Sequence, residues 1–95
     1  MSLLDDAAIE AALDDLPGWD RNGDQIVKTY TFHDFRSAMT FVDRVAEAAE
    51  AAEHHPDIDI RWNKVRLALS THSEGGLTSN DFALAAQFES LAGTR

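Results

Sequence analysis

Three of the four histidines lie in one stretch of the chain: His54 and His55 are adjacent, and His72 follows them. Imidazole has an ordinary pKa of about 6.5, so it can both accept and donate protons near neutral pH. Several histidines on one rim suit a reaction in which one atom loses a proton while another gains one. The dehydration of a carbinolamine is such a reaction, because a base removes the N–H proton while an acid protonates the departing hydroxyl.

Other polar residues of this stretch could support the histidines. Glu50 stands four residues before His54, so the two side chains should be neighbours if the last helical turn holds. Glu50 or Glu53 could then hold a ring in one tautomer. Hydroxyl and backbone groups at Ser70 and Thr71 could bind a flat polar heterocycle.

Each of these residues also has a structural explanation. A His-His pair at a helix end is often a surface cap, and His72 on a wet strand face would be solvated. Glu50 reads as an ordinary helix-surface residue, Trp62 as a core residue and Asp81 as a helix cap. A three-histidine zinc site is disfavoured because adjacent rings rarely reach one metal ion. A Ser-His-Asp hydrolase lacks a nucleophile-elbow motif here.

Alternating and helical patterns predict the elements that position the histidines. The capping-box form of Ser2 and Asp5 opens a helix that ends near Leu16. Asp34 caps a long second helix, and Thr78 with Asp81 caps a third that Gly93 closes. The buried stripe of the second helix is predicted to contain Phe35, Ala38, Met39, Val42, Val45, Ala46 and Ala49. Strands are predicted at 19–21, at 25–33 and on both sides of a turn at 63–64, with a first hairpin turn at 22–23.

The second hairpin carries a geometric prediction. With Asn63 and Lys64 as a two-residue loop, Trp62 pairs with Val65, Ile60 with Leu67 and Ile58 with Leu69. The same register sets His55 opposite His72, with Cβ atoms roughly 5 Å apart.

The order of the elements predicts an α+β fold, α-β-β-α-β-β-α, with a four-stranded antiparallel sheet and three helices packed on one face. Its 95 residues suit a single domain spanning 1–95.

A net charge of −9 argues against nucleic acid as a partner. With no cysteine, no signal peptide and no apolar membrane span, we expect a cytoplasmic protein.

The string Glu50-x-x-x-His54-His55-Pro56, with Trp62, His72 and Asp81 after it, resembles the signature of the pterin-4a-carbinolamine dehydratases. The resemblance extends to Asn63-Lys64-Val65, Leu69-Ser70-Thr71-His72 and Gly76-Leu77 and covers essentially the whole chain. It implies dehydration of 4a-hydroxytetrahydropterin to quinonoid dihydropterin, in the recycling that serves aromatic amino acid hydroxylases. Neither a metal nor an organic cofactor is implied.

The resemblance also implies roles for individual residues. His54 and His72 would form the acid/base pair, with His55 contacting the pterin. The pterin pocket would be lined by Glu53, His54, His55, Ser70, Thr71, His72 and Ser73, with Glu50, Trp62 and Asp81 in support. Family members form dimers or tetramers, so a homodimer or homotetramer is expected, with contacts on the exposed side of the second helix.

A binding module of the same fold is the alternative. An animal member of the family is also a dimerisation partner of a transcription factor, and some relatives assist Rubisco assembly. The presence of all three histidines favours the enzyme, because a scaffold would not need them.

Overall fold

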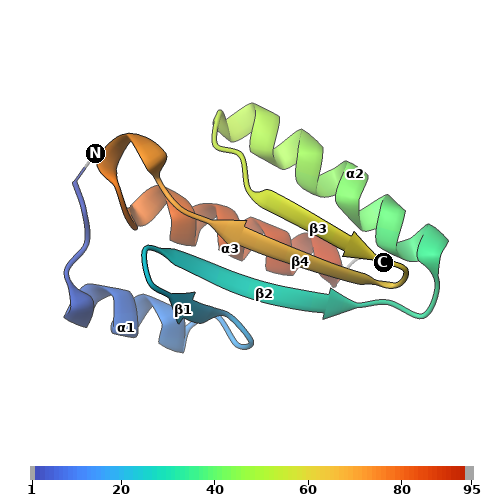
Figure 1. Cartoon of the computed structure of the whole chain (residues 1–95), viewed down its shortest axis with the longest axis horizontal. Coiled ribbons are helices and arrows are strands. Elements are labelled where there is room, and N and C mark those ends of the chain that lie inside the picture. Colours follow the sequence, from blue (N-terminus) through green and yellow to red (C-terminus); the bar gives the residue numbers. More distant parts are fainter. Residues whose placement is uncertain (1, 94–95) are drawn as a thin grey trace.

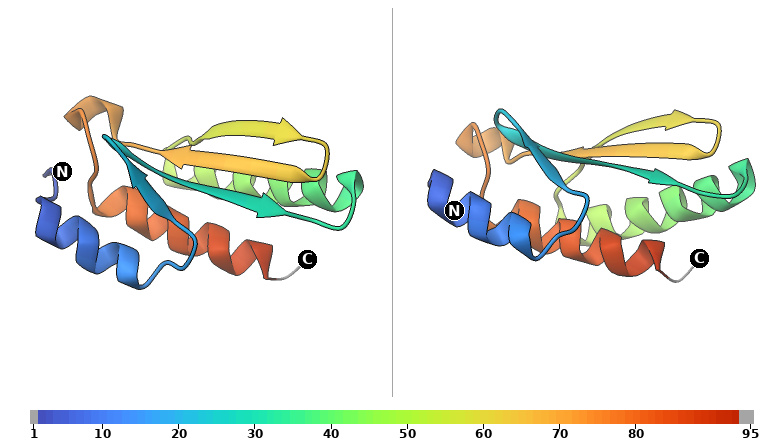
Figure 2. Two further views of the ribbon diagram at one scale, coloured as in Figure 1. Left: turned by 60° about the horizontal axis from the view of Figure 1, so that its bottom comes forward. Right: turned by 90° about the horizontal axis from the view of Figure 1, so that it is seen from below.

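The computed structural model describes residues 2–93 as one antiparallel sheet with three helices on one of its faces (Figures 1 and 2). The predicted fold class is confirmed. In chain order the elements are α1 (Asp6–Asp14), β1 (Asp20–Asn22), β2 (Gln25–Thr31), α2 (Phe35–Ala52), β3 (Asp57–Arg61), β4 (Lys64–Leu69), the short 3₁₀ helix η1 (His72–Glu74) and α3 (Ser79–Ala92).

The sheet has the strand order β1-β2-β4-β3, so β3 is an edge strand. Period-2 alternation sends Val65, Leu67 and Leu69 of β4 into a core where all three are fully buried. From the helices, Phe41 of α2 and Phe88 of α3 fill the opposite side of this core. The other face of the sheet carries no helix (Figure 2).

Two of the three predicted helix caps are confirmed. The Asp34 side chain accepts from Ser37 N at 2.7 Å, and Thr78 and Asp81 form a complete capping box. The first helix is present, but its predicted start is wrong: its cap is Asp5 rather than Ser2. Leu4 N donates to Leu77 O at 2.9 Å, which holds the preceding segment against the start of α3 and delays the helix.

The buried stripe of α2 was only partly predicted. Ala38, Val45 and Ala49 are buried as expected, whereas Phe35 is 52% exposed and Phe41, which was left out of the stripe, is 1% exposed. Phe41 packs against Tyr30 and Phe32 of the β2 region, with ring centroids 4.8 and 5.1 Å apart. The aromatic partners across the layer therefore decide which side of α2 is inside.

Both hairpin turns lie one residue from their predicted positions. Asn22 pairs with Gln25, so the first loop is 23–24, and Arg61 pairs with Lys64, so the second is 62–63. Ile60 then faces Val65 and Ile58 faces Leu67. Such a shift moves the register by two residues, which leaves Ile58 and Ile60 on the same face of the sheet as Leu67 and Val65.

The contacts of Asn63 explain the second turn. Its Nδ2 donates to Phe32 O at 2.7 Å and its carbonyl accepts from Phe32 N at 2.8 Å. This anchors Asn63 beside the end of β2, and Trp62 must take a left-handed φ of 53° to close the loop. Trp62 was predicted to be a core residue, but it is 70% exposed at this turn.

Within residues 2–93, no helix is long and apolar enough to cross a membrane.

Candidate active site

His54 is directed inward by a left-handed turn at the end of α2. Glu53, the residue that ends the helix, has a φ of 51°, a conformation usually reserved for glycine. Its N–H and that of His54 both return to Ala49 O. Glu53 was predicted to lie near the histidines, and it does. Its backbone makes the turn that sets the direction of His54.

A short contact joins His54 to a buried carboxylate. Nε2 of His54 lies 2.6 Å from Oδ1 of Asp81, whose side chain is 0% exposed, while that of His54 is 13% exposed. With Asp81 ionised, this distance requires a hydrogen on Nε2. Nδ1 is then the ring nitrogen that can exchange a proton with a substrate.

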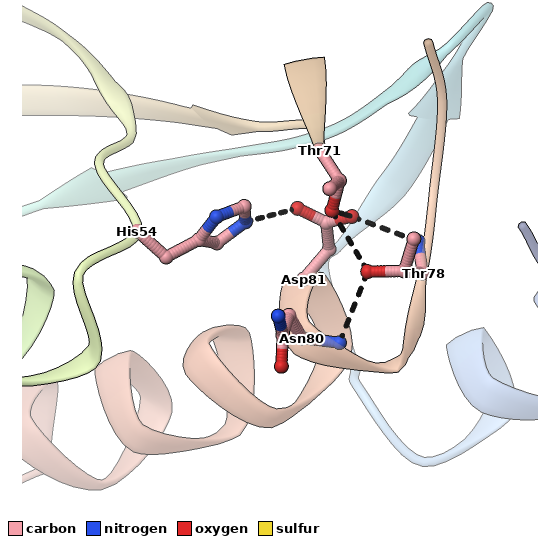
Figure 3. A network of polar contacts seen from close by, with 5 residues as sticks. All are labelled: His54, Thr71, Thr78, Asn80 and Asp81. Atoms are coloured by element: carbon pink, nitrogen blue, oxygen red, sulfur yellow. Dashed lines mark hydrogen bonds and ion pairs between the residues drawn. The ribbon is translucent and has the colours of Figure 1, made fainter. Parts of the chain in front are cut away.

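Asp81 is held in place through its second oxygen (Figure 3). Oδ2 accepts from Thr71 Oγ1 at 2.8 Å and from Thr78 N at 2.9 Å. The hydroxyls of Thr71 and Thr78 are also 2.8 Å apart, so Thr78 donates to Thr71. The cap predicted for Asp81 is therefore confirmed, and the same carboxylate also orients His54.

Glu50 contacts His55 and not His54, which corrects the predicted neighbour. His55 Nε2 lies 2.7 Å from Glu50 Oε1, and the two side chains are 62% and 77% exposed. The turn at Glu53 takes the chain off the helical path, so the four-residue spacing no longer applies. In so open a position the pair orients the ring of His55 but adds little stability.

His72 does not lie opposite His55, as the hairpin register had predicted. Strand β4 ends at Leu69, and His72 begins the 3₁₀ helix η1. Thr71 causes the departure, because its carbonyl accepts from Glu74 N and Gly75 N and its N–H donates to Gly76 O. Continuation of the observed register by two residues sets Ser70, not His72, across from His55.

The exposed His72 lines an open pocket of about 320 Å³ at the end of the sheet, together with Ser70. The other lining residues come from the β1–β2 turn and from η1: Asn22, Asp24, Gln25 and Gly75. The sequence reasoning missed these four. The turn signal at Asn22-Gly23 marked the hairpin, but only the pairing of β2 with β4 shows that it lies beside Ser70.

The predicted site residues therefore gather at one end of the sheet, with one exception. His54 and His55 precede β3, while Ser70, Thr71, His72 and Ser73 follow β4, its antiparallel neighbour. Asp81 joins the two groups because it contacts both His54 and Thr71. Trp62 follows β3 and lies at the opposite end of the strand. Within residues 2–93, no group of three or more histidine, cysteine, aspartate or glutamate side chains is arranged to hold a metal ion.

Comparison with known proteins decides the family. Residues 2–91 match the family model of pterin 4 alpha carbinolamine dehydratase. The chain belongs to this family.

Members of the dehydratase family from several bacteria resemble this chain over nearly its whole length. A protein of Thermomicrobium roseum is 56% identical over 97% of this chain and 99% of its own, and one of Nocardia farcinica is 58% identical over 95% of each. Both are provisionally named pterin-4-alpha-carbinolamine dehydratase.

Two solved structures are similar to this chain over most of its length. A transcriptional coactivator/pterin dehydratase from Brucella melitensis superposes with a TM-score of 0.92 at 34% identity, covering 95% of this chain and 98% of that one. A pterin dehydratase-like protein identified as a RuBisCO assembly factor in the alpha-carboxysome gives 0.71 at 25% identity, covering 80% and 90%.

Proposed function

We propose that this chain is a lyase that dehydrates 4a-hydroxytetrahydropterin to quinonoid dihydropterin by histidine acid/base catalysis. The observation that carries the proposal is the contact between His54 and the buried Asp81, 2.6 Å long. A carboxylate so placed holds the imidazole in one tautomer and stabilises the positive charge that develops when the ring accepts a proton. Membership of the family supports the choice of this substrate.

In this mechanism His54 is the base and His72 the acid. Nδ1 of His54 removes the N–H proton next to the carbinol carbon, and the electron pair of that bond forms the C=N bond. The C–O bond breaks as His72 protonates the hydroxyl, which leaves as water. His55, oriented by Glu50, contacts the pterin ring. No metal or organic cofactor takes part in any of these steps.

The proposal is tested by the rate of quinonoid dihydropterin formation from freshly generated 4a-hydroxytetrahydropterin. His54→Ala and His72→Ala should each lower the enzymatic rate by about 10²–10⁴-fold, the usual contribution of one positioned proton transfer. His33→Ala is the matched control, since His33 is exposed and its ring lies beside Asp34 and Ser37 at the start of α2. An added chelator should change nothing.

Three results would contradict this mechanism. If the native chain does not exceed the spontaneous rate, the enzyme assignment fails. Full activity of both histidine variants would remove the acid/base roles. Loss of activity with chelator would instead indicate a metal site.

We further propose that the protein works in the cytoplasm as a homodimer or homotetramer that returns cofactor to an aromatic amino acid hydroxylase. Self-association is supported by apolar side chains at the edge strand β3, where Ile58 and Ile60 are each 38% exposed and Trp62 is 70% exposed. The same surface supports the alternative function, a protein-binding module. That alternative gains weight from the two solved structures, whose titles name a coactivator and an assembly factor.

A further inference from the structure

We infer that the β1–β2 turn forms the second wall of the substrate site and that the carboxylate of Asp24 binds the amino-pyrimidine edge of the pterin. The inference rests on the proposed function and adds a recognition residue that the family signature does not contain.

The sheet register places this turn beside Ser70, and the turn shares a pocket with His72. Ile26 pairs with Leu69, so the next position along sets Gln25 opposite Ser70. Ser70 is also the position across from His55 in the register of β3 with β4. The serine thus lies between His55 on one side and the β1–β2 turn on the other.

The pocket at this position suits a small polar ring. Its volume of about 320 Å³ is at the lower end of the roughly 300–1,000 Å³ found for ligand pockets. The lining side chains supply an imidazole, a hydroxyl, two amides and a single carboxylate. That carboxylate, on Asp24, makes no hydrogen bond or ion pair within residues 2–93, and neither does the ring of His72.

A free carboxylate suits the pyrimidine edge of a pterin. Its pyrimidine ring presents two neighbouring N–H donors, from the ring nitrogen and the 2-amino group, and a carboxylate can accept both at once. Asp81 is committed to His54 and Thr71, and Glu50 is committed to His55. Among the residues that line the pocket, Asp24 supplies the carboxylate.

This placement separates binding from chemistry. The pyrimidine edge points to the β1–β2 turn, and the carbinolamine carbon lies toward the histidines. Loss of the Asp24 carboxylate should therefore weaken binding while the bound substrate still reacts. We expect Asp24→Asn to raise KM at least tenfold with kcat changed less than threefold.

A binding experiment tests the contact without turnover. Fluorescence titration would compare 7,8-dihydropterin with 7,8-dihydrolumazine, in which an oxygen replaces the 2-amino group. The native chain should prefer the pterin by at least tenfold, because the lumazine oxygen would face the carboxylate. Asp24→Asn should lose most of that preference. Asp20→Asn is the matched control, since Asp20 is an exposed aspartate of the same hairpin and does not line the pocket.

The outcomes separate this inference from the proposed function. If the native chain dehydrates the carbinolamine and Asp24→Asn binds both probes as the native chain does, the role of Asp24 is overturned and the enzyme assignment stands. If the native chain neither binds the pterin nor accelerates dehydration, both fail. Equal losses in Asp24→Asn and Asp20→Asn would also overturn the contact, because a general effect of charge would then explain them.

Discussion

Asp81 shows how one side chain can serve both the fold and the site. A carboxylate that is 0% exposed must have partners for both oxygens, since burying an unpaired charge is costly. One oxygen caps α3 and binds Thr71, and the other holds His54. The stability of the helix start and the orientation of the imidazole therefore depend on the same group.

Removal of the Thr71 hydroxyl should disturb the orientation of His54 without creating a cavity in the core. Thr71→Val keeps the shape of the side chain but removes the donor to Asp81 Oδ2, and a hydrogen bond to a charged group is worth about 1.5–3 kcal/mol. We expect kcat for dehydration to fall about fivefold to tenfold with KM little changed. Thr71→Ser, which keeps the hydroxyl, should recover most of the rate. Steady-state kinetics of both variants, with thermal unfolding as a check on folding, would decide; an unchanged kcat in Thr71→Val would exclude the role.

At the scale of the elements, a cluster around Glu89 ties α3 to the sheet. Its Oε1 accepts from Trp19 Nε1 at 3.0 Å, Lys28 Nζ at 2.5 Å and Tyr30 Oη at 2.5 Å. Burial alone would raise the pKa of Glu89, but the hydrogen bonds from Lys28 and Tyr30, the charge of Lys28 and the bond from Trp19 hold its pKa below the usual 4.5. Burial, with Glu89 itself, raises the pKa of Tyr30, so the phenol stays protonated as a donor.

The lowered pKa of Glu89 sets the sign of a pH effect. A group with a lower pKa in the folded than in the unfolded state contributes stability above the unfolded pKa, and this is lost as the pH falls through the folded value. The native chain should therefore lose stability in acid, below about pH 4.5. Glu89→Gln should be less stable than the native chain by about 1–3 kcal/mol at pH 7, and the difference should shrink in acid.

Thermal unfolding between pH 3 and pH 7 measures this effect. Glu47→Gln, an exposed glutamate of α2, is the control and should unfold like the native chain at every pH. A Glu89→Gln midpoint equal to the native midpoint at pH 7 would show that the cluster contributes no stability.

At the scale of the whole molecule, two exposed surfaces with apolar side chains are candidate sites for the proposed self-association. One is the edge strand β3 with Ile58 and Ile60, and the other is the exposed side of α2, which in the structure also carries Phe35. Two copies of β3 paired antiparallel about Asp59 would set Asp57 opposite Arg61 of the second copy, so their charges would be complementary.

A lysine on each surface would distinguish them. We expect Ile60→Lys to lower the mass measured by light scattering to that of a monomer, because a lysine on an edge strand opposes strand pairing. Phe35→Lys should leave the dimer intact and can at most prevent a tetramer. The reverse result would assign the primary interface to α2, and a monomeric native chain would remove both proposals.

Patterns among residues close in the sequence were enough to predict the order of the elements and the fold class of this protein. The alternation in β2 and β4, the caps at Asp34 and Thr78 and the helical spacing in α2 depend on residues close in sequence, so they predicted the element order and the fold class. The histidine string likewise indicated the family and most of the residues gathered at the end of the sheet.

The tertiary structure decided the exact partners. Asn63 shifts the second turn because it is anchored to Phe32, and Thr71 leaves the strand early, so His72 faces the β1–β2 turn instead of His55. Asp81 reaches His54 only because α3 packs against the end of α2. Each of these contacts joins segments whose separation in the sequence says nothing about their distance in space. A register or a buried ion pair is set by the packing of whole elements, and no local pattern contains it.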